Sequence, residues 1–159
     1  MASDPLTRPD SPRVIALPPL LYLGALAAGG LAQWVCPRRI VAPLPGHLVG
    51  GVLLALGVAL GWRARRAMKA AGTNIDPRLP STALVRTGPF RFSRNPLYVA
   101  VTLIYLGLAF LINSVWILST LVPVLVVMHY GVVRREERYL ESKFGAAYRE
   151  YLASVRRWL

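Results

Sequence analysis

The sequence predicts an all-α integral membrane protein with four transmembrane helices in a single domain, residues 1–159. The prediction rests on four long charge-free stretches, a hydrophobic content of 55% and an uneven placement of the basic residues. The stretches place the expected helices at about residues 17–34, 46–62, 96–112 and 115–133. At about 1.5 Å per residue, such helices approach the roughly 30 Å hydrocarbon core of a bilayer.

The basic residues predict how the chain is oriented. If both termini face the cytoplasm, 17 of the 19 lysines and arginines lie inside, and only Arg38 and Arg39 lie outside. This distribution satisfies the positive-inside rule. The net charge of +12 is then explained by orientation and by attraction to anionic lipid headgroups, so no nucleic-acid partner is needed. We expect a multi-pass protein of a bacterial or archaeal cytoplasmic membrane.

The first expected span follows a short polar tail. Residues 1–13 hold prolines and aspartates with few apolar side chains, which predicts a mobile tail. A cleaved signal peptide is the alternative interpretation of residues 17–34, but the preceding segment mixes both charge signs and no small-residue cleavage site precedes Trp34. The single Cys36 forbids an internal disulfide, and no metal site is expected.

The connections between the other spans differ in length. Only Asn113 and Ser114 separate the third and fourth stretches, which predicts a tight antiparallel hairpin. The inner segment from Arg63 to Pro96 begins as a basic helix and is then punctuated by glycines and prolines. Because it also interleaves apolar and polar residues, we expect it to fold back onto the membrane face.

The C-terminal residues predict an amphipathic cytosolic helix. Apolar side chains recur every three or four positions from Leu140 to Trp158, which defines one helix face. Gly145 marks a break in this pattern. We therefore expect one helix that extends the fourth span and a second that lies on the membrane surface.

The stretch "GPFRFSRNPLYVA" leads into the third expected span. Asn95 is a favoured N-cap and Pro96 a favoured first helical residue, so they explain the start of a helix without any further role. Tyr98 is then an interface anchor and Arg94 an inside-facing charge. This interpretation does not explain why the cap ends a punctuated loop, or why a second polar cluster follows the fourth span.

That second cluster contains Glu136 and Glu137, the only adjacent acids in the chain. Such acids commonly form helix-surface ion pairs, here Arg134 with Glu137 or Glu141. His129 lies seven residues before Glu136, hence on the same face of a regular helix. An ionisable group inside a span is a functional candidate, and the alternative is a histidine satisfied by a backbone carbonyl.

The motifs "TALVRTGPFRFSRNPLY" and "EERYLESKFGAAYREYL" occur in this order around the hydrophobic hairpin. This arrangement, over roughly Gly72 to Tyr151, resembles the isoprenylcysteine carboxyl methyltransferase family and its relatives, the membrane phospholipid N-methyltransferases. In that family the cytosolic ends of the last spans, the preceding loop and the C-terminal helix enclose S-adenosylmethionine. The resemblance implies that residues 72–151 form a cofactor-binding region.

The resemblance also implies roles for individual residues. Glu136 would take the ammonium group of the cofactor, and Arg94 with the free N–H groups at the start of the third span would take its carboxylate. The other cofactor-binding residues would be Thr82, Leu84, Val85, Phe90, Asn95, Pro96 and Tyr98. His129 and Glu137 are the candidates for a catalytic base, which is needed only if the acceptor loses a proton.

The implied function is S-adenosylmethionine-dependent methyl transfer at the cytoplasmic membrane face. The acceptor would be lipid-like or amphipathic: an isoprenylcysteine-type carboxylate, a phospholipid amine or a small thiol. The expected partners are this substrate and the membrane lipids. The alternative is a non-catalytic membrane module that binds a lipid or a partner, and it is favoured by Asn95 and Val132, which stand where that family has a histidine and an arginine.

Overall fold

The computed structural model describes residues 11–12 and 14–158, and this part of the chain is helical without strands. Its elements are α1 (Pro18–Val35), α2 (Pro43–Ala70), the 3₁₀ turn η2 (Gly88–Arg91), α3 (Pro96–Ile112), α4 (Val115–Val127), the π-helix η3 (Met128–Val133), α5 (Arg134–Phe144) and α6 (Ala146–Ser154). The all-α prediction is therefore confirmed over the described residues. Apart from residues 11 and 12, the expected tail 1–13 lies outside them.

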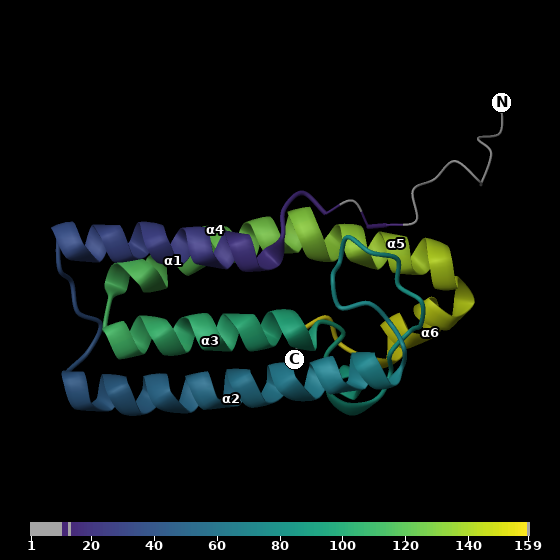
Figure 1. Cartoon of the computed structure of the whole chain (residues 1–159), viewed down its shortest axis with the longest axis horizontal. Coiled ribbons are helices and arrows are strands. Elements are labelled where there is room, and N and C mark those ends of the chain that lie inside the picture. The colour runs from purple at the N-terminus through teal and green to yellow at the C-terminus, as the bar shows by residue number, and fades with distance from the viewer. Residues whose placement is uncertain (1–10, 13, 159) are drawn as a thin grey trace.

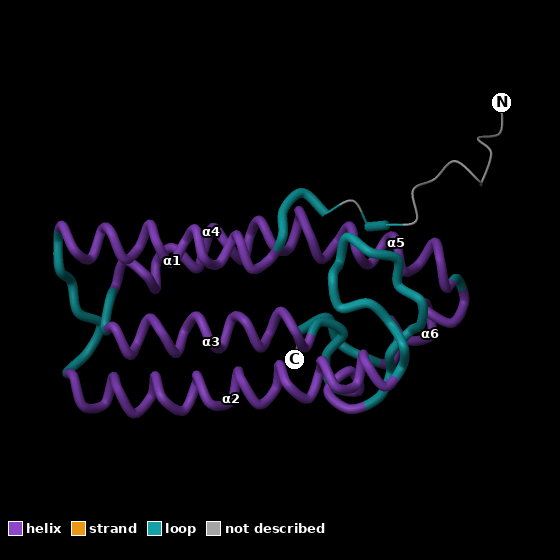
Figure 2. The backbone as a smooth tube through the Cα atoms, viewed as in Figure 1, coloured by secondary structure: helices purple, strands orange, loops and turns teal. Residues whose placement is uncertain are grey.

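The long helices form two layers (Figures 1 and 2). One layer contains α1 packed on α4, and the other contains α2 packed on α3. Helix α5 continues α4 through η3, and Gly145 separates α5 from α6 with a φ of 54°. The loop between α2 and α3 lies at this same end of the molecule (Figure 1). The expected break at Gly145 and the expected extension of the fourth apolar helix are both confirmed.

Helices α2 and α3 approach so closely that their backbones touch. A Cβ atom added to Gly50 would lie 2.8 Å from the carbonyl oxygen of Gly107, and one added to Gly57 would lie 2.8 Å from that of Ala100. Small residues at helix interfaces allow this kind of contact, which is typical of helices packed in membranes. The α2–α3 layer therefore depends on glycine at these positions.

Aromatic and hydroxyl side chains join the two layers. Tyr22 of α1 and Tyr105 of α3 stack edge to face with ring centroids 5.8 Å apart. The Tyr22 hydroxyl bonds Thr102 Oγ1 at 2.8 Å, and the Tyr105 hydroxyl bonds Thr120 Oγ1 at 2.8 Å. Buried polar groups need such partners. These two bonds tie α1 to α3 and α3 to α4 in the middle of the apolar core.

A two-residue turn links α3 to α4, as predicted. Asn113 adopts a left-handed conformation with a φ of 56°. Its Oδ1 accepts the backbone N–H groups of Ile40 (2.9 Å) and Val41 (3.2 Å), and its Nδ2 donates to the Val41 carbonyl (2.8 Å). Ser114 Oγ accepts from the N–H of Ile117 at 3.2 Å and so caps α4. This turn therefore also fixes the loop between α1 and α2.

Two helices are long and apolar enough to cross a membrane by length and composition, rather than the four expected. They are Pro43–Ala70 and the continuous helix Val115–Phe144. Helix α3, at 17 residues, is a shorter apolar helix. Helix α1 has 18 residues, among them two prolines and Gln33, and it is not one of the two.

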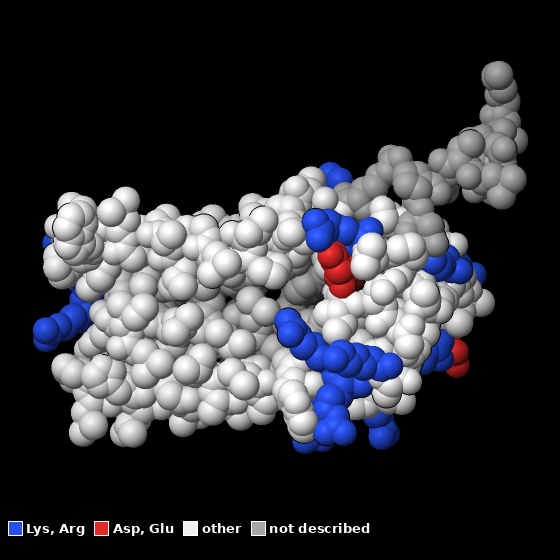
Figure 3. Space-filling view, viewed as in Figure 1, with Lys and Arg blue, Asp and Glu red and all other residues white. Residues whose placement is uncertain are grey.

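The surface of the helix layers is apolar between two charged ends. Figure 3 shows basic side chains gathered around α5, α6 and the end of α2, an uncharged band along the helices, and further basic atoms at the opposite tip. Large apolar side chains are exposed in this band, including Val52, Val122 and Leu125. Water disfavours such a continuous apolar surface. The surface thus fits a lipid environment.

The glycine contacts give a paired stability prediction. Gly50→Ala should destabilise the fold by about 1–3 kcal/mol, because its Cβ must push the two backbones apart. Gly51→Ala is the matched control on the same helix, since a Cβ there meets nothing within 4 Å. Thermal unfolding in detergent should show a lower midpoint for Gly50→Ala alone. Equal midpoints for the two variants would contradict the close packing.

Candidate functional site

A cavity of about 700 Å³ lies between the two layers at the charged end of the molecule. The start of α1, one face of α2, the loop residues 75–78, the start of α3 and Glu136 line it. In Figure 3 a hollow between the layers opens beside acidic and basic side chains at this end. Pockets that bury a drug-sized ligand measure roughly 300–1,000 Å³. The cavity therefore has the size of a ligand site.

A second cavity, of about 70 Å³, lies between the first one and the C-terminal helices. Loop residues 81 and 83–85, α5 and α6 contribute to its walls. The residues that line both cavities are Met68, Phe90, Arg94, Asn95 and Glu136. Four of these five are predicted site residues, so the structure brings the two distant motifs to one shared wall.

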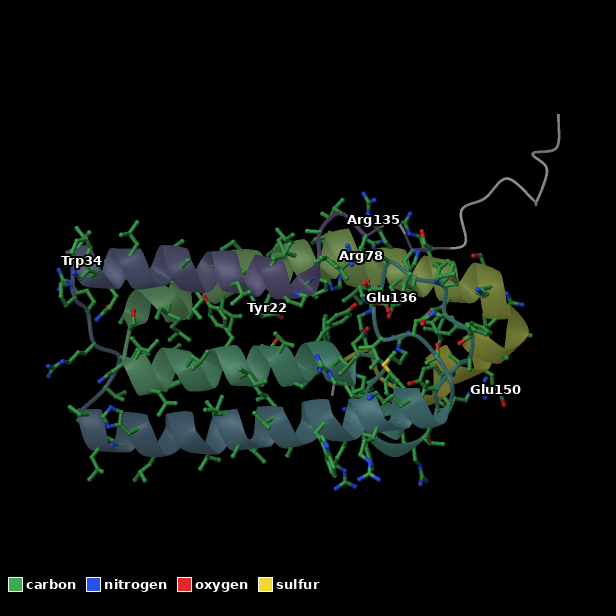
Figure 4. The ribbon with its side chains drawn as sticks, in the orientation of Figure 1. Tyr22, Trp34, Arg78, Arg135, Glu136 and Glu150 are labelled. Atoms are coloured by element: carbon green, nitrogen blue, oxygen red, sulfur yellow. The ribbon has the colours of Figure 1, made fainter. Side chains whose placement is uncertain are left out.

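Glu136 faces the larger cavity from α5. Its Oε2 accepts a hydrogen bond of 2.8 Å from the hydroxyl of Tyr98 on α3, and Figure 4 shows the Glu136 side chain between the two layers. Burial raises the pKa of Glu136 to about 6, which the Tyr98 bond opposes and the negative charge of Glu137 reinforces. None of the ion pairs between described residues includes Glu136.

Glu137 has a different environment, because two arginines surround it. Arg157 donates from Nε to Oε1 (3.0 Å) and from Nη2 to Oε2 (2.8 Å). Arg94 Nη1 lies 3.3 Å from Oε1. The side chains of Glu137 and Arg94 are only 13% and 11% exposed. A buried carboxylate requires this kind of compensation.

The start of α3 is held by the C-terminal residues. Asn95 occupies the N-cap position and Pro96 the first helical position, as predicted, but the Asn95 side chain does not cap the helix. Its Nδ2 instead donates to the Arg157 carbonyl at 3.0 Å. The backbone N–H of Arg94 donates to the Arg156 carbonyl, also at 3.0 Å. Chain segments about 60 residues apart are thereby joined beside the cavity.

Arg94 has one donor that no described group satisfies. Its Nε is buried and has no hydrogen-bond partner, although the Arg94 side chain lines both cavities. Leaving a buried donor unpaired costs free energy, so such groups are rare and call for an explanation. An acceptor atom of a ligand in the cavity would satisfy this donor.

Two tyrosines of α6 form the wall opposite the loop. Tyr148 is 1% exposed and its ring centroid lies 6.2 Å from that of Tyr151. The Tyr151 hydroxyl donates to the Phe90 carbonyl at 2.7 Å. Burial raises the pKa of Tyr151 to about 12 and that of Tyr148 as well. Both phenols therefore stay neutral near pH 7, and the Tyr151 phenol acts as a hydrogen-bond donor.

This region of the sequence matches known proteins. The profile of the phospholipid methyltransferase family matches residues 45–147. The chain belongs to this family of methyltransferases. The matched residues run from the start of α2 into α6 and include the shared wall of the two cavities.

Two curated relatives are similar to parts of this chain, and neither of their names describes a methyltransferase. An uncharacterized protein of Haemophilus influenzae is 44% identical over 64 residues, which is its whole length and 40% of this chain. The cobalt-zinc-cadmium resistance protein CzcN of Cupriavidus metallidurans is 36% identical over 99 residues, 62% of this chain and 45% of that protein. No solved structure matches the chain significantly.

The loop residues predicted to bind a ligand divide into two groups. Leu84 and Val85 line the smaller cavity, and Phe90 lines both. Thr82 does not line either one, because its Oγ1 donates to the Gly72 carbonyl at 2.7 Å. Its side chain therefore closes the base of the loop rather than facing a cavity. Pro96 and Tyr98 line the larger cavity.

The structure separates His129 from Glu136, contrary to the expected shared face. His129 lies in η3, where its ring contacts those of Tyr130 (4.8 Å) and Trp158 (6.5 Å), and it lines neither cavity. A π-helix takes more residues per turn than an α-helix. A spacing of seven residues that crosses η3 therefore does not return to the same face.

The expected surface ion pairs of α5 are also corrected. Arg134 stacks on Tyr130 with its guanidinium carbon 5.7 Å from the ring centroid. Glu137 pairs with arginines outside α5, and Glu141 lies 4.0 Å from Arg149 of α6. Arg134 thus keeps a local partner, whereas both acids pair outside α5, because side-chain bonds join α5 to α3, to α6 and to the residues after it.

Sequence reasoning missed several residues around the cavities. Arg157 lies beyond both motifs, and its partner Glu137 is distant in the sequence. Asp76 and Arg78 form a salt bridge of 2.7 Å, and both line the larger cavity. The apolar spacing of the C-terminal residues includes Tyr148 and Tyr151 and was the one signal that indicated them.

The Tyr98–Glu136 bond predicts how one carboxyl group titrates. Tyr98→Phe should raise the pKa of Glu136 above about 6, because the bond that favours the carboxylate is lost. Infrared titration of the protonated carboxyl band would measure this shift, with Glu136→Gln to assign the band. Tyr105→Phe is the control, since that hydroxyl bonds Thr120. An unchanged midpoint in Tyr98→Phe would refute the coupling.

Proposed function

We propose that this chain transfers a methyl group from S-adenosylmethionine to a lipid-like acceptor at the cytoplasmic face of a membrane. The observation that supports this most directly is the shared wall of the two cavities. There a buried acid and an arginine donor lie together, and neither the acid's charge nor the donor is paired by any described residue. Family membership supplies the reaction class. The acid and the arginine of the shared wall form a binding surface for a zwitterionic ligand.

The charges of the wall fit the cofactor. Its ammonium group needs a carboxylate, which Glu136 offers, and its carboxylate needs a donor, which Arg94 Nε offers. Phe90 and the apolar face of α2 offer surfaces for a planar base. When bound, the cofactor supplies an electrophilic methyl group on a sulfonium sulfur. The residues Leu84, Val85, Asn95 and Tyr98 complete the proposed binding region within 72–151.

The contribution of the chain to catalysis is then alignment and exclusion of water. Methyl transfer from a sulfonium is a direct displacement, so it benefits from holding the reacting groups in line in a dry site. An amine or thiol acceptor must lose a proton, whereas a carboxylate does not. Glu137 is held by both of its oxygens to Arg157, and His129 lines neither cavity. We therefore do not assign the proton to either.

The proposed setting is a four-helix membrane domain with both termini in the cytoplasm. The uncharged band between two charged ends supports it (Figure 3), and so does the excess of basic residues at the end that holds the cavities. The two helices long and apolar enough to cross, α2 and the continuous helix Val115–Phe144, would span the bilayer, and α1 and α3 would pack against them. The membrane proposed is a bacterial or archaeal cytoplasmic membrane.

Binding of S-adenosylhomocysteine tests the proposed site. Purified protein in detergent should bind it by calorimetry, and Glu136→Gln should weaken binding by roughly ten- to a hundredfold, the cost of losing a charge-assisted bond. Glu141→Gln is the matched control on the same helix, since Glu141 lines neither cavity. Absence of binding by the folded wild-type protein would refute the proposal.

The same interaction predicts a pH dependence. Since the pKa of Glu136 is raised to about 6, its carboxylate form disappears as the pH falls below that value. Affinity for S-adenosylhomocysteine should therefore fall from pH 7.5 to pH 5, and Glu136→Gln should remove most of this dependence. Tyr98 and Glu137 are the ionisable groups that act directly on it. Arg65, Asp76, Arg78 and Arg94 line the same cavity. An equal slope in both proteins would assign the dependence to another group.

Methyl incorporation identifies the acceptor. Membranes that contain the protein should transfer label from the methyl donor into the lipid fraction, and Glu136→Gln membranes should not. Label in the peptide or small-thiol fraction would instead select one of the other two acceptor classes. Cofactor binding with no label in any fraction would support the non-catalytic membrane module.

A further inference from the structure

The residues that follow α6 cross the start of α3. We call residues 155–158 the C-terminal strap. Its backbone carbonyls accept three bonds from the segment before α3: from the N–H of Arg94 (3.0 Å), from Asn95 Nδ2 (3.0 Å) and from Ser93 Oγ (3.4 Å). The strap is therefore joined by hydrogen bonds to the residues that form the shared wall of the cavities.

One side chain of the strap adds a second attachment. Arg157 forms a bidentate salt bridge with Glu137, and the hydrogen bonds to this carboxylate raise the pKa of Arg157. Parallel N–H donors of a guanidinium fix the orientation of a carboxylate as well as its position. The strap thus holds α5 and the start of α3 at the same time.

Glu137 transmits this attachment to Arg94. Its Oε1 accepts from Arg157 Nε at 3.0 Å and lies 3.3 Å from Arg94 Nη1. The Arg94 guanidinium is thereby held at one edge, while its buried Nε remains without a partner. With Arg157 removed, Glu137 would lose two charge-assisted bonds and would reorient toward its remaining cation.

We infer that Arg157 is a positioning residue of the proposed cofactor site. It acts through Glu137 and the strap to hold Arg94 with its free donor toward the shared wall, where the carboxylate end of the cofactor would bind. This inference rests on the proposed function. It assigns a role to a residue outside both sequence motifs, and it makes Glu137 a structural anion instead of a catalytic base.

Arg157→Ala tests the inference by separating affinity from turnover. The variant should bind S-adenosylhomocysteine about ten- to a hundredfold more weakly, as expected when a binding group is misplaced. In methyl-transfer assays its KM for S-adenosylmethionine should rise by a similar factor, and its kcat at saturating cofactor should stay within about threefold. Arg149→Ala is the matched control, because it removes the same charge from an exposed pair with Glu141. It should leave both constants unchanged.

Glu137→Gln distinguishes positioning from proton transfer. A positioning anion predicts the same rise in KM as Arg157→Ala, and a double variant no worse than either single one. A catalytic base predicts instead a large loss of kcat with an unchanged KM, which would overturn the role given to Glu137. Arg157→Lys keeps the positive charge but cannot form the bidentate salt bridge with Glu137. It should fall between Arg157→Ala and the wild type.

The binding measurements distinguish a failure of the inference about Arg157 from a failure of the proposed function. If the wild type binds the cofactor and Arg157→Ala matches Arg149→Ala, the inference is wrong while the proposed site stands. If the wild type does not bind, the proposed function fails first. Should Arg157→Ala not fold, Arg157→Lys carries the test, and wild-type constants for that variant would count against the inference.

Discussion

The site depends on two neighbouring acids of α5 that cannot face the same way. Successive residues of an α-helix point about 100° apart, so the side chains of Glu136 and Glu137 contact different groups. Glu136 faces Tyr98 and the larger cavity, and Glu137 faces the two arginines that link α3 to the C-terminal strap. One helical step thus separates a group that is available to a ligand from a group that holds the walls together.

The energetic contrast between the two acids follows from their partners. A carboxylate taken out of water needs compensating charge or several donors. Glu137 has both, whereas Glu136 has one phenol and a like-charged neighbour. Burial raises the pKa of Glu136, and no ion pair between described residues supplies a positive charge to offset it. A cationic group in the cavity would supply this charge. Its Coulomb attraction to the buried Glu136 would be stronger than to the exposed Glu150, which lies on α6 at the same end of the molecule (Figure 4).

The sequence predicted the helices better than the partners of their side chains. Charge-free stretches and Gly145 located the helices because they reflect local composition and backbone preference. The convergence of Asn95 and Glu136 followed from motif resemblance, and both residues line the same cavities. The role of Asn95 could not be predicted, because its amide bonds a carbonyl 62 residues away instead of capping its own helix. Which side chains of α5 face the cavity could not be predicted either, because the rotation of α5 about its axis depends on the π-helix η3.

The π-helix connects these observations. Gly131 lies within η3, and its carbonyl accepts the N–H of Ile15 at 3.3 Å. A Cβ on Gly131 would clash with the Ile15 side chain, so the segment before α1 fills the space that glycine leaves. Because η3 precedes α5 directly, any return to regular α-helix would rotate α5 and move both acids together. A helix defect supported by a distant segment therefore sets which acid meets the cavity and which meets the arginines. Because the segment before α1 packs against η3, the π-helix is held in place, and the acids of α5 keep fixed orientations.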